Sequence, residues 1–277
     1  MFIQYTALAW SRRGFPFRVL PMLLLLRLRG ARCALIFHDP KAYAGVRVID
    51  HFRRAVQQWT MKRAYQLAHR SIFAIAIESV DWLPPKSKKA TFIAIGANVS
   101  KNDAINREGC SAARESRTVA VFGVTGGDAL EREVRDVAHA VRYASMHGRH
   151  LTLVVFGRNS KEAEDQMRRA LEGTSVLAEF LGVILPQDVL HVLSCSDVLL
   201  FVRGSVSSSR SSALAGVACG LPIVGYRGPE TGFPVTEAGL ELVIPGNLDA
   251  LGESLNRVLN DDELRQRLSR KSLYAYA

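Results

Sequence analysis

Short apolar runs of strand length alternate with amphipathic helical segments along nearly the whole of this chain of 277 residues. Strands and helices that alternate in this way are typical of parallel sheets built from β-α-β units. A chain of this length can bury a substantial core in one large or two medium domains. We therefore expect an α/β protein.

The second part of the chain, residues 118–277, has the pattern of a complete doubly wound sheet. Its expected strands are Val119–Phe122, Leu151–Phe156, Val176–Leu181, Val198–Val202, Ile223–Tyr226 and Leu240–Ile244. Its expected helices are Ala129–Met146, Lys161–Leu171, Pro186–Leu193 and Ser211–Gly220, followed by two terminal helices.

The first part, residues 1–100, supplies fewer strands than such a domain needs. Strands are expected over Ala34–Phe37, Ser71–Ile77 and Thr91–Ile95, with a helix over Ile49–Leu67. The sequence then becomes polar and loses its apolar periodicity, which predicts a linker over residues 101–117. The predicted organisation is a partial domain, a linker and a complete domain over 118–277.

Charge is unevenly divided between these parts. Residues 1–117 contain 20 Lys and Arg against 7 Asp and Glu, whereas residues 118–277 contain 16 against 19. The basic first part is a candidate for contact with lipid head groups, a phosphorylated acceptor or nucleic acid, or it is simply a solvated basic surface. No nucleic-acid-binding motif accompanies it, so we expect no nucleic-acid partner.

The apolar segment near the N-terminus superficially resembles a twin-arginine export signal. Arginines interrupt it at both ends, no cleavage site follows, and it is too short to span a membrane. A core helix over Phe15–Leu28 fits better, and the protein is expected in the cytoplasm. The four cysteines form no C-x-x-C pair and are expected to be reduced.

The strongest local signal lies between an apolar strand and a helix, from Phe201 to Ser212. Ligands of open parallel sheets bind beyond the carboxyl ends of strands, and a helix N-terminus there presents unpaired N–H groups and a partial positive charge. This position suits a diphosphate, to which Arg210 would add charge-assisted hydrogen bonds. The alternative is a flexible polar loop whose serines cap the helix. The serines in question are Ser207, Ser209, Ser211 and Ser212.

Three other strand ends point toward the same crevice. After the first strand, a turn containing Gly126 and Gly127 lets the backbone approach a phosphate, or serves only for positive φ. Arg158 follows the second strand and either reaches a phosphate or faces solvent. Gly182, at the end of the third, can offer backbone groups to a base.

These residues belong to a longer pattern that resembles the donor domain of retaining glycosyltransferases of family 4. Its most specific part is the Ala-x-Gly-x-Pro segment Ala218–Pro222, followed by two apolar residues. Gly182, Gly239 and Val243–Gly246 fall at matching places. The resemblance implies a GT-B fold, in which two Rossmann-like parallel-sheet domains flank a cleft. The C-terminal domain would bind a UDP- or GDP-sugar without a metal or a separate cofactor, and the N-terminal domain, here incomplete, would bind the acceptor.

The sequence departs from this family where its polar contacts lie. Ser207 and Ala215 stand where two glutamates are usual, and Arg210 replaces a glycine. The Arg and Lys that usually follow the first strand of this domain are missing, with Val124 in the arginine position. Either Arg210 and its serines replace the lost cations, or nucleotide binding is weak.

In the first part, His38 follows a strand and precedes Asp39. The segment is similar to the family's loop that carries a histidine near the acceptor and the transferred sugar. A histidine in this setting can transfer a proton or hydrogen-bond a hydroxyl; the alternative is a surface or capping role. Because the reaction places charge on the leaving diphosphate, the resemblance implies catalysis by His38 and Arg210, with support from the serines and Arg158.

We therefore expect a retaining, metal-independent glycosyltransferase of the hexosyltransferase type. It would act on a glycan or lipid-linked acceptor in polysaccharide biosynthesis, with peripheral contact to the anionic inner membrane face. The chain opens at Phe2–Tyr5 without the first strand and glycine-rich loop of such a domain, which favours a truncated product or a misassigned start. The alternative is a catalytically impaired, nucleotide-binding scaffold.

Overall fold

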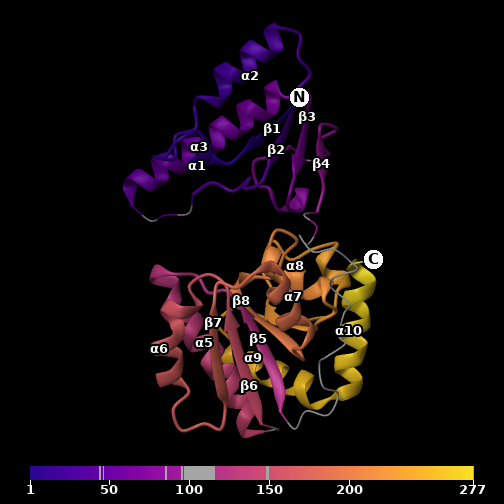
Figure 1. Cartoon of the computed structure of the whole chain (residues 1–277). Helices are drawn as coiled ribbons and strands as arrows, with labels where there is room; N and C mark the ends of the chain where they lie inside the picture. Colours follow the sequence, from indigo (N-terminus) through magenta and orange to yellow (C-terminus); the bar gives the residue numbers. More distant parts are fainter. Residues whose placement is uncertain are drawn as a thin grey trace. The chain divides into compact units, whose positions relative to one another are not determined.

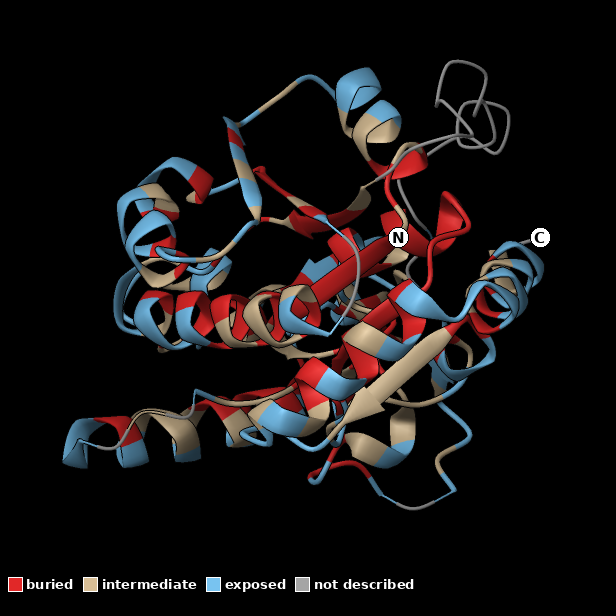
Figure 2. Cartoon of the chain, turned by 90° about the horizontal axis from the view of Figure 1, so that it is seen from below, coloured by how far each residue is buried: buried red, intermediate tan, exposed pale blue. Residues whose placement is uncertain are grey.

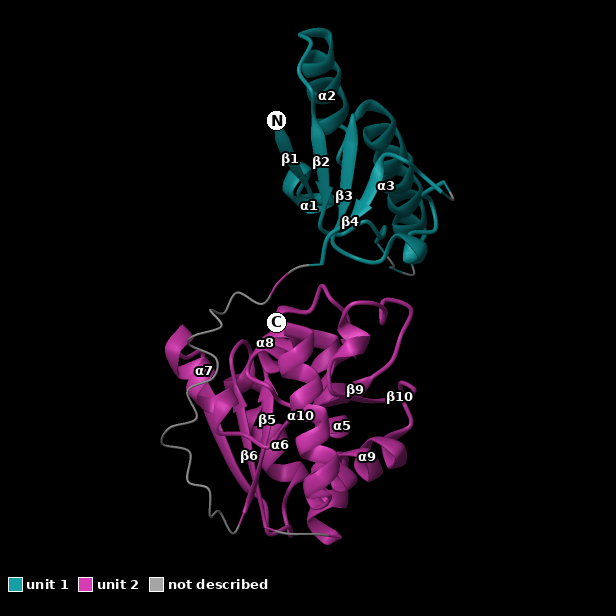
Figure 3. Cartoon of the chain, turned by 90° about the vertical axis from the view of Figure 1, so that its right-hand side faces the viewer, with its two compact units in different colours: residues 1–95 teal, residues 96–277 magenta. Residues whose placement is uncertain are grey.

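The computed structural model describes residues 1–43, 45, 47–84, 86–94, 96, 116–147 and 150–276. The chain divides into two compact units, Met1–Ile95 (unit 1) and Gly96–Ala277 (unit 2), coloured separately in Figure 3. Most of the predicted linker, residues 101–115, lies outside the described residues, and Arg117 already belongs to the first strand of unit 2.

Unit 1 contains four parallel strands in the order β1-β2-β3-β4 (Figure 1). Its elements are β1 (Phe2–Tyr5), α1 (Ala7–Trp10), α2 (Val19–Leu28), β2 (Ala34–Phe37), α3 (Val48–Leu67), β3 (Arg70–Phe73), the 3-10 turn η1 (Ile77–Ser79) and β4 (Ala90–Phe92). The strand predicted over Ala34–Phe37 is confirmed residue for residue.

The sheet of unit 1 is buried on one face. Alternate residues such as Tyr5, Leu35 and Phe73 point into a single hydrophobic cluster, which α2 and α3 complete. The residues between them, such as Phe2 and Gln4, are exposed. Because side chains of a strand alternate between faces, one covered face produces this period-two pattern.

The helix predicted over Phe15–Leu28 begins only at Val19. Pro16 has no N–H to donate and disfavours helical geometry in the residue before it, so the chain turns before the helix starts. As predicted, α2 contributes to the core: Val19 and Leu23 are buried, and Leu20, Met22 and Leu26 pack against the cluster, but the other half of the helix is exposed.

Unit 2 contains six parallel strands in the order β10-β9-β8-β5-β6-β7. Its strands are β5 (Arg117–Phe122), β6 (Leu151–Phe156), β7 (Leu177–Gly182), β8 (Val198–Ser205), β9 (Ile223–Tyr226) and β10 (Leu240–Val243). Its helices are η2 (Gly127–Ala129), α5 (Leu130–Met146), α6 (Ser160–Ala170), α7 (Pro186–Ser194), α8 (Ser211–Ala218), η3 (Val235–Glu237), α9 (Leu248–Asn260) and α10 (Asp262–Tyr276).

Both faces of this sheet are packed. One hydrophobic cluster joins the strands to α5, α6 and α9, and a second joins the opposite face to α7 and α8. Figure 2 shows buried residues concentrated along the strands. The apolar residues of α5, including Leu130, Val134, Val137 and Val141, recur at the spacing that places them on one helix face.

The strands of unit 2 lie where the sequence predicts them, with one instructive difference. β8 continues to Ser205, three residues past the predicted end, and its pairing with β9 shifts register between Phe201 and Ser205. The α/β fold class with two parallel-sheet units is confirmed. Cys33 and Cys219 are buried and neither is in a disulfide, whereas Cys195 is disulfide-bonded, so the expectation of a reduced thiol is wrong there.

Candidate functional site

The strand order of unit 2 reverses direction between β5 and β8, and we call the carboxyl end of these two strands the crevice. From β5 the chain proceeds outward through β6 and β7, and from β8 it proceeds in the opposite direction through β9 and β10. The loops that follow β5 and β8 therefore leave toward opposite sides. Such a switch point at the carboxyl ends of parallel strands is where α/β sheets bind their ligands.

The turns after β5 and β6 are joined by backbone hydrogen bonds at this edge. Gly123 donates its N–H to the carbonyl of Phe156 over 2.6 Å, and Val124 donates to the carbonyl of Arg158 over 3.0 Å. These bonds hold Arg158 beside the glycine-rich turn, as the shared edge of the sheet predicts.

The turn after β7 is joined to the same array. The N–H of Gly157 donates to the carbonyl of Gly182 over 2.6 Å. On the other side, the Asn159 amide donates to the β5 turn, and a Cβ at Gly126 would lie 2.9 Å from its nitrogen. The structure thus brings Gly126, Gly127, Arg158 and Gly182 together at one edge of the sheet.

Arg203, which the sequence patterns do not single out, lies beside the turn after β5. It belongs to the extension of β8, and its side chain reaches the turn after β5: a Cβ built at Gly123 would lie 2.8 Å from its Nη1. Gly123 also has a φ of +77°. Among the described residues, the buried Nε of Arg203 has no hydrogen-bond partner. A glycine at position 123 therefore makes room for this guanidinium.

Charges around Arg203 are predominantly positive. Burial lowers the pKa of Arg203; the carboxylate of Glu133 opposes this, while the positive charges of Arg210 and Arg158 lower the pKa further. Glu133 is itself buried, and its Oε2 accepts the N–H of Thr125 over 2.7 Å. Because arginine stays protonated in proteins, three cations face one carboxylate here. This arrangement is complementary to an anion.

The N-terminus of α8 opens beside the same strand. Arg210 is its N-cap residue, exposed, and no side chain among the described residues caps the helix. A Cβ at Gly204 would lie 3.5 Å from Nη2 of Arg210, so this side chain folds back over the end of β8. Among the described residues, the first N–H groups of α8 therefore have no side-chain cap.

The four serines of this loop do not share one environment. Ser207 is fully buried and its Oγ lies 2.9 Å from Oγ of Ser209, which is half-buried. Ser212 is buried and Ser211 is exposed. Ala215, like Ser207, is buried, so neither of the positions where glutamates are usual presents a carboxylate.

His38 belongs to unit 1, whereas Arg210 belongs to unit 2. His38 is exposed at the end of β2, where its backbone N–H donates to the carbonyl of Tyr5 over 3.3 Å. The next residue, Asp39, is close enough to the Tyr5 hydroxyl for its charge to raise the pKa of Tyr5, after the larger effect of burial. His38 is thus presented at a strand end, as predicted.

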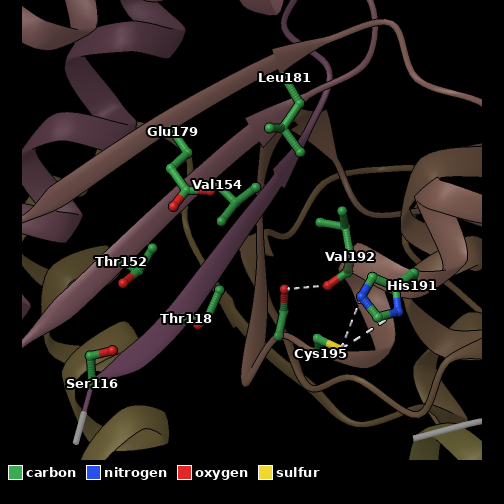
Figure 4. Close-up of a pocket in the computed structure, with 10 residues that line it drawn as sticks. Ser116, Thr118, Thr152, Val154, Glu179, Leu181, His191, Val192 and Cys195 are labelled. Carbon is green, nitrogen blue, oxygen red and sulfur yellow. Dashed lines mark hydrogen bonds between the residues drawn. The ribbon is translucent and has the colours of Figure 1, made fainter. Parts of the chain in front are cut away.

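A pocket of about 350 Å³ lies elsewhere in unit 2, between β5, β6, β7 and α7 (Figure 4). His191 of α7 and Cys195, which follows that helix, face each other on one side of it, and Glu179 lies on the other. None of the residues predicted from the sequence lines this pocket. In the described part of the chain, no three His, Cys, Asp or Glu side chains are grouped so as to hold a metal ion.

Comparisons with known proteins reveal likeness at the level of structure. No protein-family model and no curated protein matches the chain in sequence. A UDP-forming α,α-trehalose-phosphate synthase from Burkholderia xenovorans is similar with a TM-score of 0.64 at 12% identity, over 99% of this chain and 69% of the synthase.

Two other solved structures have the same kind of similarity. HepE from Anabaena, solved in complex with UDP and glucose, has a TM-score of 0.60 at 15% identity, over 99% of this chain and 72% of HepE. TarM from S. aureus, solved with UDP and α-GlcNAc-glycerol, has a TM-score of 0.62 at 10% identity, over 88% of this chain and 47% of TarM. This chain thus corresponds to less than half the length of TarM. With its two parallel-sheet units and these structural neighbours, the chain has the GT-B type of fold, built from Rossmann-like domains.

Proposed function

We propose that unit 2 binds the diphosphate of a UDP- or GDP-sugar in the crevice between β5 and β8. The observation that carries this proposal is the guanidinium of Arg203, whose Nε is buried without a partner among the described residues. Arg210 and Arg158 add positive charge around it. A buried donor left unpaired is costly, and a phosphate oxygen would satisfy it.

The activity we infer is retaining, metal-independent transfer of a sugar, of the hexosyltransferase type, to a glycan or lipid-linked acceptor. The bond between the anomeric carbon and the diphosphate breaks, a bond to an acceptor hydroxyl forms, and the hydroxyl proton passes to the leaving phosphate. The arginines and the first N–H groups of α8 stabilise the charge that builds up on that phosphate. The likeness of the fold to two proteins solved with UDP, TarM and HepE, supports this proposal.

Calorimetric titration with UDP, GDP and UDP-glucose, with and without EDTA, tests the donor site. Replacing Arg203 by Gln removes charge-assisted hydrogen bonds to phosphate, each contributing about 1.5–3 kcal/mol, so we expect affinity to fall about 100-fold. Arg203→Lys keeps the positive charge but loses the forked pair of donors, so its affinity should lie between that of Arg203→Gln and that of the parent.

The matched control is Arg169→Gln, an exposed arginine at the end of α6, which should leave affinity unchanged. If no nucleoside diphosphate binds at millimolar concentration, or if Arg203→Gln binds as tightly as the parent, the proposed site is wrong. A requirement for Mg²⁺ would contradict metal independence alone.

His38 is assigned the acceptor side of the reaction. His38→Ala should lower kcat while leaving the affinity for the nucleotide unchanged, since His38 belongs to unit 1 and the arginines belong to unit 2. If the substitution weakens nucleotide binding and turnover equally, His38 acts through the donor site instead.

A second function, nucleotide binding without transfer, is favoured by the buried Ser207 and Ala215. Neither can supply the carboxylates that the resemblance leads one to expect. Incubation with radiolabelled UDP- and GDP-sugars, followed for both transfer and hydrolysis, distinguishes the two functions. Tight binding that depends on Arg203, without turnover of either kind, would favour the scaffold.

A further inference from the structure

Helix α2 is apolar almost all round, yet half of its residues are exposed. Its sequence, Val19–Leu28, contains Arg27 as its one charged residue. Leu25 is 59% exposed and Leu28 is 75% exposed. A helix that is apolar on every side is normally buried, and a contiguous exposed apolar patch marks an interaction site.

Aromatic side chains extend this apolar area onto the neighbouring helix. α2 packs against α3 on the same face of the sheet, and both belong to unit 1, shown in teal in Figure 3. Phe17, just before α2, contacts Trp59 of α3 with ring centroids 6.4 Å apart. Phe52 lies on α3 two turns before Trp59, and all three rings are exposed. We call α2, Phe17, Phe52 and Trp59 the α2 surface.

Cations surround the α2 surface, and acids are absent from the nearby sequence. No Asp or Glu occurs among the first 38 residues. The Arg63 guanidinium lies 6.0 Å from the centroid of the Trp59 ring. No ion pair between described residues involves the exposed cations of this region. They are Arg12, Arg13, Arg18, Arg27, Arg29, Arg32, Lys62 and Arg63.

We propose that the α2 surface docks on an anionic lipid bilayer. Exposed leucines and aromatic rings flanked by arginines match an interface that is apolar within and negatively charged at its surface. A nucleic acid would use the arginines but not the leucines. At 10 residues, α2 is about 15 Å long, about half of what the hydrocarbon core requires, so it lies in the interface. The described part of the chain contains no helix suited in length and hydropathy to crossing a membrane.

Co-sedimentation of the full chain with phosphatidylcholine vesicles, with and without 30% phosphatidylglycerol, tests this proposal. We expect binding to the anionic vesicles that weakens as salt is raised, and little binding to the neutral ones. Replacing both Leu25 and Leu28 by Gln should lower the partition coefficient at least about tenfold, because each inserted leucine contributes by its buried area.

Two further measurements keep the result interpretable. Ile244→Gln, which alters an equally exposed apolar residue of unit 2, should bind vesicles as the parent does. Lipids brominated in the acyl chain should quench tryptophan emission, and Trp59→Phe should remove most of that quenching. Retained folding of the Leu25 and Leu28 variant is checked by circular dichroism.

Three results would overturn the proposal. The first is the absence of binding to anionic vesicles at physiological salt. The second is vesicle binding that the leucine substitutions do not weaken. The third is binding to duplex DNA that is as tight as vesicle binding and that the leucine substitutions do not weaken. The last would identify a general polyanion surface instead. The test does not depend on the proposed donor site, because nucleotide titration of the same variant should give the parental affinity.

Discussion

Unit 1 and unit 2 are built from the same parallel β-α-β arrangement but stabilise their sheets differently. In unit 2 two hydrophobic clusters cover the two faces of a six-stranded sheet. In unit 1 a single cluster covers one face of four strands. The second face of a parallel sheet is usually covered as well, so unit 1 depends on fewer buried contacts.

The comparison is experimentally accessible because of where the tryptophans lie. All three, Trp10, Trp59 and Trp82, belong to unit 1, so tryptophan fluorescence reports its unfolding. Far-ultraviolet circular dichroism is dominated by the helices of unit 2. The two signals can therefore follow the units separately in one denaturation experiment.

The largest effect is expected from Phe37→Ala in unit 1. Phe37 is fully buried and contacts both Phe73 and Trp82, at 4.9 and 5.5 Å between ring centroids. Truncating a buried phenylalanine costs about 3–5 kcal/mol, enough to unfold a unit with one cluster. The fluorescence transition should move to lower urea while the dichroism transition stays. If both move together, the units are not independently stable.

In unit 2, Gly239→Ala should destabilise by about 2–4 kcal/mol. A Cβ at this position would collide with the backbone carbonyl of Leu268, and the Gly239 N–H donates to Oγ of Ser272 over 3.1 Å. The dichroism midpoint should fall. Gly246→Ala is the control, since it has a positive φ but open space around it, and should cost about 1 kcal/mol. Equal costs at both glycines would refute the steric explanation.

Tyr226→Phe should cost unit 2 about 1–3 kcal/mol. The hydroxyl donates to Oδ2 of Asp136 over 2.8 Å, and both residues are buried. Burial, and then Asp136, raise the pKa of Tyr226 above its ordinary value. Above about pH 10 the unfolded tyrosine ionises while the folded one keeps its proton, so this stability is lost as pH rises. Denaturation followed by dichroism at pH 8 and 11 checks this: the parent should lose more stability than the variant.

The smallest effect, of opposite sign, is expected from Tyr5→Phe in unit 1. The Tyr5 hydroxyl is buried, and among the described residues it has no hydrogen-bond partner. Removing it should be neutral or stabilise the unit by up to about 1 kcal/mol, measured as the fluorescence midpoint at pH 7. A clear destabilisation would show that the hydroxyl is satisfied after all.

The sequence predicts the elements well because apolar runs and turn glycines are local signals. It predicts the bounds of the strands Ala34–Phe37 and Leu151–Phe156 to the residue. It also predicts that Gly126, Arg158 and Gly182 lie at one edge of the unit 2 sheet. It misses Arg203, because the contact of that side chain with Gly123 depends on which strands are neighbours. It predicts that α2 contributes to the core but not that half of the helix is exposed, since apolar composition alone does not reveal how much of a helix is covered.

The hydrogen bonds that join the turns after β5, β6 and β7 bear on how this crevice could be redesigned. With Gly123 bonded to Phe156 and Gly157 to Gly182, these tips form one continuous rim. A longer or reshaped loop at any one of them would disturb the other two, so we expect that grafting a single turn does not give new selectivity. The segment from Val206 to Arg210 is the better place to introduce variation, because its hydrogen bonds run to β9, α8 and Thr231 and within itself rather than to these turns.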